Sequence, residues 1–318
     1  MAFRSGFVSI IGRPNAGKST LLNALVGEKL AIVTRKPQTT RNRIRGIVNV
    51  EHKGKLPSGQ IVLMDTPGVH KPINSLNRRM MKEVYDAVEG CDLLLLIVDA
   101  NERFGAGDKF VLDIVKKTGQ KCFLLLNKID RLDKQRLLPL IAEYKELHDF
   151  AEVLPISAMK GQGLDTLRDA VVRALPEGPR YFPKDQVTDQ PERFLVAELI
   201  REQVLLATGQ EVPYATTVLI EQYEERGKLT RIAAAIFCER EGQKAILIGK
   251  HGSNLKKMGT AARLQIERLL NTKVFLELFV KVRPGWRDSR QFVEETDWRT
   301  QLERMSHAGP ADEPETDS

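Results

Sequence analysis

The sequence predicts an α/β domain with a mostly parallel sheet and helices on both faces, followed by a smaller α+β domain. In the first half, short apolar segments alternate with longer helical patterns, which is typical of parallel sheets covered by helices. A proline-rich stretch at 176–183 then interrupts any continuous helix. Beyond it, a helix, a group of strands, a second helix and a last strand indicate another compact module.

The first domain is expected to contain six strands. Apolar segments bounded by turn residues place them at 7–11, 45–50, 61–64, 93–98, 123–126 and 153–155. We expect the second and third to form a hairpin, because Pro57, Ser58 and Gly59 mark a turn between them. After the first strand and a loop, one helix begins at Lys18, and the domain ends in a helix at 164–175.

The second half divides into a linker, a domain and a tail. We predict a helix at about 193–208, strands at about 215–223 and 229–239, a strand-like segment at 244–248, a helix at 253–270 and a strand at 274–282. The last ten residues carry four acids and almost no apolar side chain, so we expect them to be disordered. The predicted boundaries are 1–176, a linker at 177–192, a second domain at 193–290, and a C-terminal segment at 291–318.

The composition limits the classes of protein to which this chain can belong. The chain has 318 residues, 42% hydrophobic and 29% charged, and a net charge of +7 that mildly favours an anionic partner. No segment approaches the ~18–20 apolar residues of a membrane span, and the N-terminus lacks a signal-peptide pattern, so we expect a soluble, intracellular protein. Cys91, Cys122 and Cys238 form no C-x-x-C pair and are expected to be buried hydrophobic side chains.

A phosphate-binding loop follows the first strand. Such a loop points backbone N–H groups at phosphates, and the following helix presents its positive end to them. We expect Lys18 to reach the β- and γ-phosphates and Ser19 to bind Mg²⁺. The loop matches G-x-x-x-x-G-K-[ST] and consists of Gly12, Arg13, Pro14, Asn15, Ala16, Gly17, Lys18 and Ser19, with Thr20 next in the helix.

A second motif predicts guanine as the base. The four residues after the strand at 123–126 emerge at the carboxyl edge of the sheet. Asp130 can accept hydrogen bonds from guanine N1–H and the 2-amino group. Adenine lacks these donors and would leave a buried carboxylate unpaired, at a cost of about 1–3 kcal/mol. Asn127 is expected to hold the loops together and the Lys128 stem to cover the base. The expected base-binding residues are Asn127, Lys128, Ile129 and Asp130, with Ser157, Ala158 and Met159 offering N–H groups to guanine O6.

Two further segments are expected beside the γ-phosphate. Asp65-Thr66-Pro67-Gly68 follows the strand at 61–64, which places a carboxylate near Mg²⁺ and the Gly68 N–H near the phosphate. Upstream, Gln38-Thr39-Thr40-Arg41 supplies a threonine for the Mg²⁺ shell, and we favour Thr40 over Thr39. The expected metal ligands are Ser19, Thr40 and Asp65, and the residues expected to support hydrolysis are Lys18, Thr40 and Gly68.

Val69 stands where many GTPases carry a glutamine that orients the attacking water. Valine cannot do this, so we expect Val69 to line the nucleotide site without catalysing, and intrinsic turnover to be slow. The water would then be positioned by the backbone, another switch residue or a partner. Asn15 offers a carbonyl that can ligate a monovalent cation near the phosphates, or make a hydrogen bond that stiffens the loop. Both interpretations stay open.

The C-terminal domain contains a second candidate loop. The apolar segment 245–248, interpreted as a strand, is followed by G-x-x-G and a helix, as in the KH loop that clamps about four nucleotides of single-stranded RNA. Between 250 and 290, ten Lys or Arg oppose three acids; a solvated basic face is the alternative. We expect Trp286 to pack rather than to stack a base. The expected RNA-binding residues are Ile248, Gly249, Lys250, His251, Gly252, Lys256 and Lys257.

Together these motifs resemble the bacterial Era family of GTPases. The resemblance rests on segments 12–19, 36–41, 65–70, 127–130, 155–158, 239–244 and 248–252, and it covers about residues 6–290. It implies an α/β P-loop GTPase domain followed by a type II KH domain, with GTP, GDP and Mg²⁺ as ligands. It further implies binding of the 3′ end of 16S ribosomal RNA in the GTP state, assistance in 30S subunit maturation, a cytoplasmic location and contact with the inner membrane surface. We also expect a monomer.

Two alternatives stay open. A GTPase that serves tRNA modification has similar switch regions, but that family inserts its GTPase domain into a larger helical domain, whereas here the motifs open the chain. The other alternative is a nucleotide-gated binding module whose basic domain contacts an acidic protein or a lipid surface.

Overall fold

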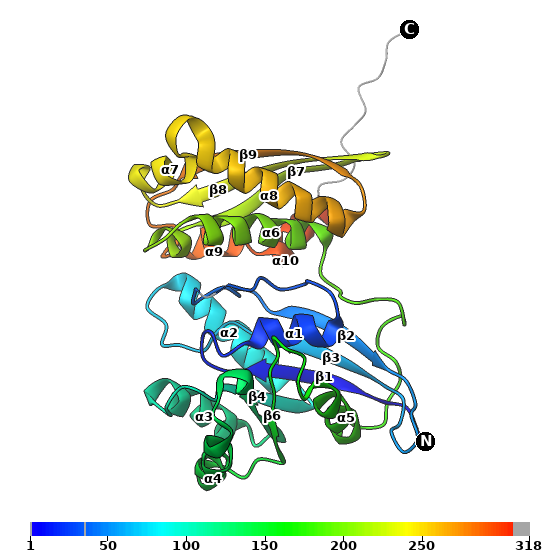
Figure 1. The fold of residues 1–318 in the computed structure, drawn as a ribbon. Coiled ribbons are helices and arrows are strands. Elements are labelled where there is room, and N and C mark those ends of the chain that lie inside the picture. Colours follow the sequence, from blue (N-terminus) through cyan, green and yellow to red (C-terminus); the bar gives the residue numbers. More distant parts are fainter. Residues whose placement is uncertain (1, 35, 308–318) are drawn as a thin grey trace. The chain divides into compact units, whose positions relative to one another are not determined.

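The computed structural model describes residues 2–34 and 36–307. Its chain divides into two compact units, coloured by sequence in Figure 1. The first consists of the described residues up to Ile73 together with Asn77–Pro191, and the second of Asn74–Leu76 and the described residues from Glu192 onward.

The first unit is built on a six-stranded sheet with the order β2-β3-β1-β4-β5-β6. The predicted hairpin is confirmed, because β2 and β3 pair antiparallel while the other neighbours pair parallel. All six expected strands are present. Their bounds are β1 Arg4–Ile11, β2 Ile44–Val50, β3 Gly59–Asp65, β4 Leu93–Asp99, β5 Cys122–Asn127 and β6 Glu152–Pro155.

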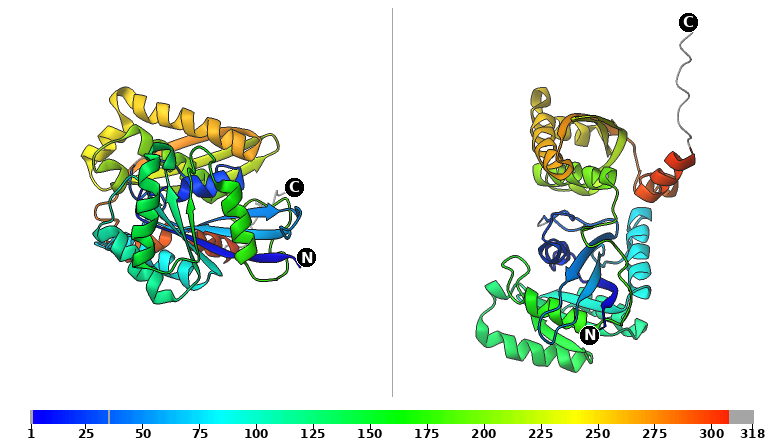
Figure 2. Two further views of the ribbon diagram at one scale, coloured as in Figure 1. Left: turned by 60° about the horizontal axis from the view of Figure 1, so that its bottom comes forward. Right: turned by 90° about the vertical axis from the view of Figure 1, so that its right-hand side faces the viewer.

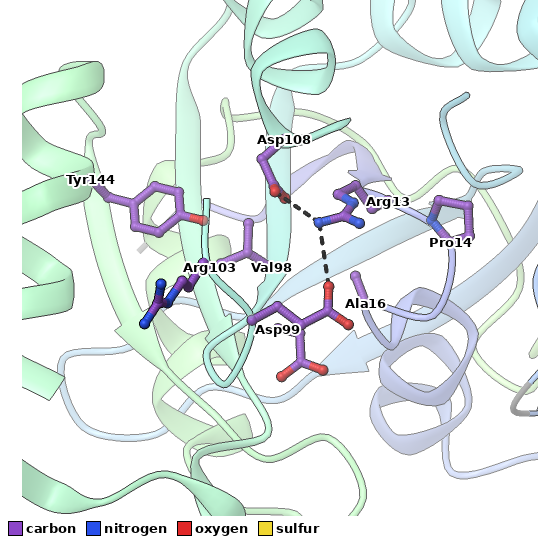
Figure 3. A pocket seen from close by; sticks show the side chains of 9 residues that line it. Arg13, Pro14, Ala16, Val98, Asp99, Arg103, Asp108 and Tyr144 are labelled. Carbon is purple, nitrogen blue, oxygen red and sulfur yellow. Dashed lines mark hydrogen bonds and ion pairs between the residues drawn. The ribbon is translucent and has the colours of Figure 1, made fainter. Parts of the chain in front are cut away.

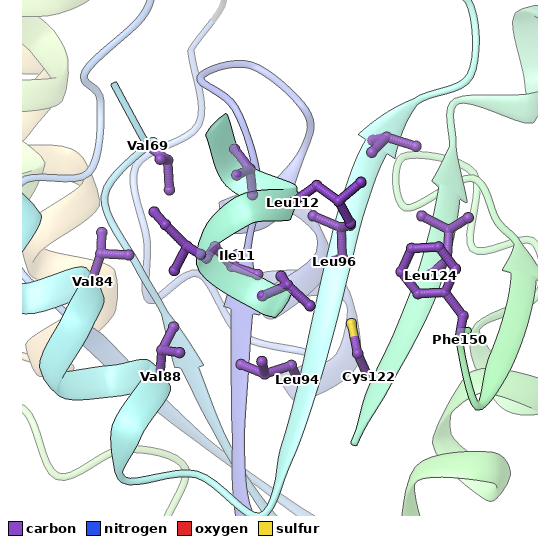
Figure 4. Close-up of a cluster of buried hydrophobic side chains, with 14 of the residues drawn as sticks. Ile11, Val69, Val84, Val88, Leu94, Leu96, Leu112, Cys122, Leu124 and Phe150 are labelled. Carbon is purple, nitrogen blue, oxygen red and sulfur yellow. The ribbon is translucent and has the colours of Figure 1, made fainter. Parts of the chain in front are cut away.

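Helices cover both faces of this sheet, as predicted. On one face, Val84 of α2 and Leu112 of α3 join a buried cluster with Ile11 and Leu96 of the sheet (Figure 4). On the other face, Leu22 of α1 lies against Gly46, and Val172 of α5 lies against Gly59. The helix bounds are α1 Lys18–Val26, α2 Ser75–Glu89, α3 Ala106–Thr118, α4 Leu137–Leu147 and α5 Leu164–Ala174.

The segment predicted to be a linker is hydrogen-bonded to the sheet of the first unit. The buried Gln60 side chain accepts hydrogen bonds from the N–H groups of Tyr181 and Phe182 and donates to the Phe182 carbonyl. Further along, Ile47 N–H donates to the Val187 carbonyl. Residues 181–187 therefore run beside β2, which is an edge strand.

The second unit is a three-stranded sheet with the order β7-β8-β9, packed against helices (Figure 2). The first strand pair is antiparallel and the second is parallel. Helices α6 and α8 supply the apolar side chains that bury the even-numbered residues of β8, such as Ile232 and Ala234. The bounds are α6 Glu192–Ala207, β7 Thr217–Arg226, β8 Leu229–Cys238, α7 Glu241–Ile248, α8 Ser253–Leu270 and β9 Lys273–Val282.

The strand expected at 244–248 is wrong, because this segment belongs to helix α7. The buried Gln243 side chain accepts hydrogen bonds from the N–H groups of Glu239 and Arg240, which fixes the start of the helix. Gln243 and Leu247 are buried whereas Ala245 and Ile246 are exposed. Burial at every fourth residue is typical of a helix. In the sequence, however, a run of four apolar residues fits a buried strand as well as a helix.

The residues after β9 contain two helices that were not predicted from the sequence, α9 Arg290–Glu295 and α10 Trp298–His307. The acidic tail at 309–318 lies outside the described residues. Trp286 packs as expected, with its indole buried and its N–H donating to the Ala215 carbonyl over 2.8 Å. No helix in the described part of the chain is long and apolar enough to cross a membrane.

All three cysteines are buried and unpaired, as expected. Burial raises the pKa of the Cys91 thiol to about 11 and that of Cys122 to about 12. Such thiols are protonated at neutral pH and act as small hydrophobic groups.

Candidate functional site

The phosphate-binding loop connects β1 to α1. Gly17 has φ +107°, and a Cβ there would lie 2.2 Å from Asn127 Nδ2, so this position requires glycine. Lys18 is buried and its ammonium donates to the carbonyls of Gly12 and Arg13 over 3.1 and 2.9 Å. Burial lowers the pKa of Lys18 to about 8, although the Asp65 charge opposes this shift. The loop thus holds its lysine inside the curve of its own backbone.

Three oxygen-bearing side chains from separate segments meet beside this lysine. Ser19 Oγ lies 2.7 Å from Asp65 Oδ2 and 2.9 Å from Thr40 Oγ1, and Thr40 Oγ1 donates to Asp65 Oδ2 over 3.2 Å. Burial raises the pKa of Asp65 to about 6, while Lys18, Ser19 and Thr40 lower it. Asp65 Oδ1 is buried and has no hydrogen-bond partner among the described residues. A hard, oxygen-ligated cation such as Mg²⁺ fits this donor set.

The choice between the two threonines is decided by their contacts. Thr40 Oγ1 faces Ser19 and Asp65, whereas Thr39 Oγ1 donates to the Lys36 carbonyl over 2.7 Å and lies 3.0 Å from Thr34 Oγ1. The structure therefore brings Thr40, and not Thr39, to the predicted metal site.

The Asp65–Gly68 segment lies against the phosphate-binding loop. Thr66 Oγ1 donates to the Ile10 carbonyl, and a Cβ on Gly68 would lie 2.9 Å from Pro14. Val69 is only 2% exposed, and its side chain belongs to the buried apolar cluster of Figure 4. Its N–H donates to the Gly12 carbonyl over 3.2 Å. The Val69 side chain thus contributes to the core, and contact of this residue with the nucleotide stays a prediction.

The predicted base-binding residues converge from two strand ends. Asn127 Nδ2 donates to the Ala16 carbonyl over 2.8 Å, and Asn127 Oδ1 accepts from Ala158 N–H over 3.0 Å. Asn127 therefore ties the two loops together, as expected. Ser157 Oγ donates to Asp130 Oδ1 over 2.6 Å, and Ile129 N–H donates to the Ile156 carbonyl. Met159 lies next in the chain after Ala158 and is 67% exposed.

Two residues that were not singled out from the sequence complete this arrangement. Asp99 ends β4, and its Oδ2 lies 2.6 Å from the Lys128 ammonium, which also donates to the Asn15 carbonyl over 2.8 Å. Asn101 Nδ2 donates to the Lys128 carbonyl. An aspartate at the carboxyl end of an apolar strand was the available signal in the sequence.

A pocket adjoins the loop on the side of α3 (Figure 3). Arg13 Nη1 lies 2.9 Å from Asp108 Oδ2 and 3.3 Å from Glu102 Oε2. Asp108 also accepts a hydrogen bond from Gly105 N–H at the start of α3. The Arg13 side chain thus anchors the phosphate-binding loop to α3.

The G-x-x-G residues form a tight connection between α7 and α8. Gly249 and Gly252 have φ +72° and +75°, and the Lys250 and His251 side chains between them are exposed. Asn254 Nδ2 donates to the Ile246 carbonyl across the loop. Lys256 and Lys257 are exposed on the first turns of α8, so the basic side chains lie beside the loop, as predicted. Ile248, the last residue of α7, is half-buried.

Both units match family models. The model described as a 50S ribosome-binding GTPase matches residues 7–128, and the KH domain model matches residues 211–287. The chain is 51% identical to GTPase Era of Geobacter metallireducens over 92% of its length and 97% of the relative. It is 48% identical to GTPase Era of Syntrophus aciditrophicus, covering 92% and 94% of the two chains.

Two solved structures resemble most of the chain. One is a variant of Aquifex aeolicus Era bound to GDP·AlF4⁻, with a TM-score of 0.87, and the other is Era in complex with MgGDPNP and nucleotides 1506–1542 of 16S ribosomal RNA, with a TM-score of 0.88. Each is 37% identical to this chain, of which it covers 92%, and the chain covers 98% of each.

Proposed function

The chain belongs to the Era family of GTPases, and from that premise we propose that this GTPase binds the 3′ end of 16S ribosomal RNA and assists 30S subunit maturation. The observation that carries the proposal is that one chain contains a phosphate-binding loop, two hydrogen-bonded segments after β5 and β6, and a G-x-x-G loop flanked by exposed lysines. We assign the GTPase domain to residues 1–176, the linker to 177–192 and the RNA-binding domain to 193–290.

In the proposed reaction, the loop from Gly12 to Ser19 binds the phosphates and Lys18 moves from its carbonyl partners to the β- and γ-phosphates. Ser19, Thr40 and Asp65 hold Mg²⁺, which neutralises phosphate charge when bound. The Gly68 N–H contacts the γ-phosphate. Asp130 accepts the N1–H and 2-amino donors of guanine, and Lys128 covers the base.

We expect the intrinsic turnover to be slow. A glutamine that would orient the attacking water is missing, and the Val69 side chain is buried in the core. The water is then oriented by the backbone, by another switch residue or by a partner. Asn15 as a ligand of a monovalent cation remains a prediction, and a hydrolysis rate measured in K⁺ and in Na⁺ tests it.

RNA binding is assigned to residues 248–252 with Lys256 and Lys257. The test compares Gly252→Asp with Gly227→Asp in the β7–β8 turn, using a labelled oligonucleotide with the sequence of a 16S rRNA 3′ end. Both glycines have positive φ, +75° and +60°, and a Cβ added at either would meet no atom within 4 Å, so the two changes add the same charge under matched strain. We expect Gly252→Asp to weaken binding about tenfold or more, because a carboxylate then faces the RNA phosphates. Equal affinity of the two variants would contradict the assignment.

The two activities are proposed to be coupled through the linker. Thr40 lies shortly before β2, and β2 carries linker residues 187–189 through hydrogen bonds to Val187, Thr188 and Asp189. When bound GTP orders Thr40, the position of β2 is proposed to change, and with it that of the linker residues hydrogen-bonded to β2. RNA affinity is expected to be higher with a GTP analogue than with GDP, and equal affinities would contradict the coupling.

The rival functions are separable. A tRNA-modification GTPase is not supported for a chain that covers 97% of an Era relative. If the basic domain instead serves an acidic protein or a lipid surface, the 16S rRNA oligonucleotide will not bind the chain. The cytoplasm as the place of action, contact with the inner membrane and a monomeric state belong to the proposal; sedimentation with vesicles and sedimentation velocity test the last two.

A further inference from the structure

The turn after β4, residues Asp99, Ala100 and Asn101, holds the guanine-binding segment at three points. Ala100 N–H donates to the Asn127 carbonyl over 2.9 Å, Asn101 Nδ2 donates to the Lys128 carbonyl over 3.1 Å, and the Lys128 ammonium donates to Asp99 Oδ2 over 2.6 Å. We propose that Asp99 is a positioning residue for the guanine nucleotide and acts by fixing the direction of the Lys128 side chain. This inference rests on the proposed binding of guanine nucleotides at this site.

The sheet brings these residues together. Parallel pairing of β4 with β5 places Asp99 directly beside Asn127 at the carboxyl edge. Lys128 then turns the chain through a left-handed conformation, with φ +65°, so that its side chain returns toward the strand ends. Asp99 and Lys128 are 29 residues apart in sequence, and their contact depends entirely on this pairing.

Asp99 is itself held in place. Its Oδ1 accepts hydrogen bonds from the backbone N–H and the side-chain amide of Asn101, over 3.0 and 3.2 Å. Its Oδ2 is thereby aimed at Lys128, and the side chain is only 13% exposed. Burial raises the pKa of Asp99, but the hydrogen bonds from Lys128 and Asn101 outweigh it, so the pKa lies below its usual value. The carboxylate is therefore ionised at neutral pH.

The Lys128 ammonium bridges two parts of the site. It donates to Asp99 on one side and to the carbonyl of Asn15, in the phosphate-binding loop, on the other. A lysine side chain has four rotatable bonds, and immobilising a flexible side chain on binding opposes affinity. With Asp99 in place, the stem is already extended between the two partners before the nucleotide binds. Without the carboxylate, the stem must be ordered by the nucleotide itself.

The variants Asp99→Asn, Asp99→Glu, Lys128→Met and Asp99→Asn/Lys128→Met, made in the full chain, test the proposal. The readout is the dissociation rate of fluorescently labelled GDP, with the melting temperature of each variant as a check on folding. We expect Asp99→Asn to dissociate GDP ~10-fold faster, the effect of losing about 1.4 kcal/mol. In the Lys128→Met background the same change should alter the rate less than about twofold, since the partner is already gone. Asp99→Glu keeps the negative charge, so its GDP dissociation rate should lie between those of the wild type and Asp99→Asn.

A second readout distinguishes an effect through Lys128 from a general disturbance of the nucleotide site. Inosine diphosphate lacks the 2-amino group that Asp130 is proposed to bind, whereas the Lys128 stem covers any purine plane. Asp99→Asn should therefore weaken GDP and inosine diphosphate by the same factor. A change in their ratio would mean that the Asp130 contact had been disturbed, and would overturn the proposed route through Lys128.

Asp92→Asn is the matched control. Asp92 precedes β4 at the opposite end of the strand, where its Oδ2 accepts a hydrogen bond from Phe7 N–H. We expect its GDP dissociation rate to equal that of the wild type. The inference is overturned if Asp99→Asn leaves the rate unchanged, if it acts equally in the Lys128→Met background, or if Asp92→Asn has the same effect. A wild-type chain that does not bind GDP would overturn the proposed function as well.

Discussion

The Ser157 hydroxyl donates a 2.6 Å hydrogen bond to Asp130 Oδ1. The loop after β6 therefore orients the carboxylate that follows β5, and the two strands are neighbours in the sheet. The other carboxylate oxygen, Asp130 Oδ2, lies 3.8 Å from Arg131 Nε. This arrangement leaves a carboxylate of defined orientation at the edge where the base is proposed to bind, and it leads to the first prediction.

Asp130→Asn should exchange guanine preference for xanthine preference. An asparagine amide presents a donor where guanine needs an acceptor, and the 2-oxo group of xanthine can accept that donor. Loss of two hydrogen bonds to a charged group predicts GTP affinity at least ~100-fold lower. Titration with labelled GDP and xanthosine diphosphate measures the ratio. Asp133→Asn, the same change at a helix cap nearby, is the control and should keep guanine preference.

Thr40→Ala should raise the Mg²⁺ concentration needed for hydrolysis, whereas Thr39→Ala should not. Only the Thr40 hydroxyl contacts Ser19 and Asp65, while that of Thr39 caps the local turn at Lys36. For Thr40→Ala, we expect the Mg²⁺ concentration that gives half-maximal GTP hydrolysis to rise about tenfold. This is the effect of losing one metal ligand that contributes ~1.4 kcal/mol of binding free energy. A larger shift for Thr39→Ala would reverse the assignment.

Val69→Gln should not accelerate hydrolysis and should destabilise the fold. The Val69 side chain is buried beside Ile11 and Val84, so a glutamine there places an amide in an apolar cluster. We expect the free energy of unfolding to fall by about 1–3 kcal/mol. Denaturant unfolding and single-turnover GTP hydrolysis measure the two effects. Val69→Ile is the apolar control, and a faster Val69→Gln enzyme would show that the side chain reaches the phosphate.

Gln60→Ala should release the linker from the sheet. The Gln60 side chain satisfies the N–H groups of Tyr181 and Phe182, and we expect its loss to lower the free energy of unfolding by about 2 kcal/mol. Amide hydrogen exchange should become faster across residues 181–189. Gln186→Ala removes only a local hydrogen bond within the linker, to the Thr188 carbonyl, and should leave the exchange of 181–183 unchanged. Unchanged exchange in Gln60→Ala would mean that other contacts hold the linker.

The elements that the sequence predicted well share a physical reason. The phosphate-binding loop and the segment Asn127–Asp130 are defined by residues adjacent in the chain, and each follows an apolar strand whose length and composition are unambiguous. The error at 244–248 arose where that signal fails, because four apolar residues suit a strand and a helix equally. The buried Gln243 side chain caps the start of the segment and stabilises it as a helix. The burial of Gln243 follows from packing within the second unit.

Residues whose role depends on distant partners could not be placed in the same way. Asp99 appears in the sequence only as a strand end, and its contact with Lys128 exists only because β4 and β5 pair in one register. Val69 was expected beside the nucleotide, yet its side chain faces the core. The short helices α9 and α10 follow a proline and glycine stretch, where local propensity is weak and packing decides.

The sequence was enough to predict a phosphate-binding loop, a carboxylate proposed to select guanine, a basic G-x-x-G domain and the family to which they belong. These follow from residue types at fixed short spacings, since the local backbone and the functional groups suffice to define them. Which groups meet became visible only in the folded protein: Thr40 rather than Thr39 contacts Asp65, Asp99 contacts Lys128, and Gln60 contacts the linker. Strand register and burial set those distances, and neither is encoded within any single short segment.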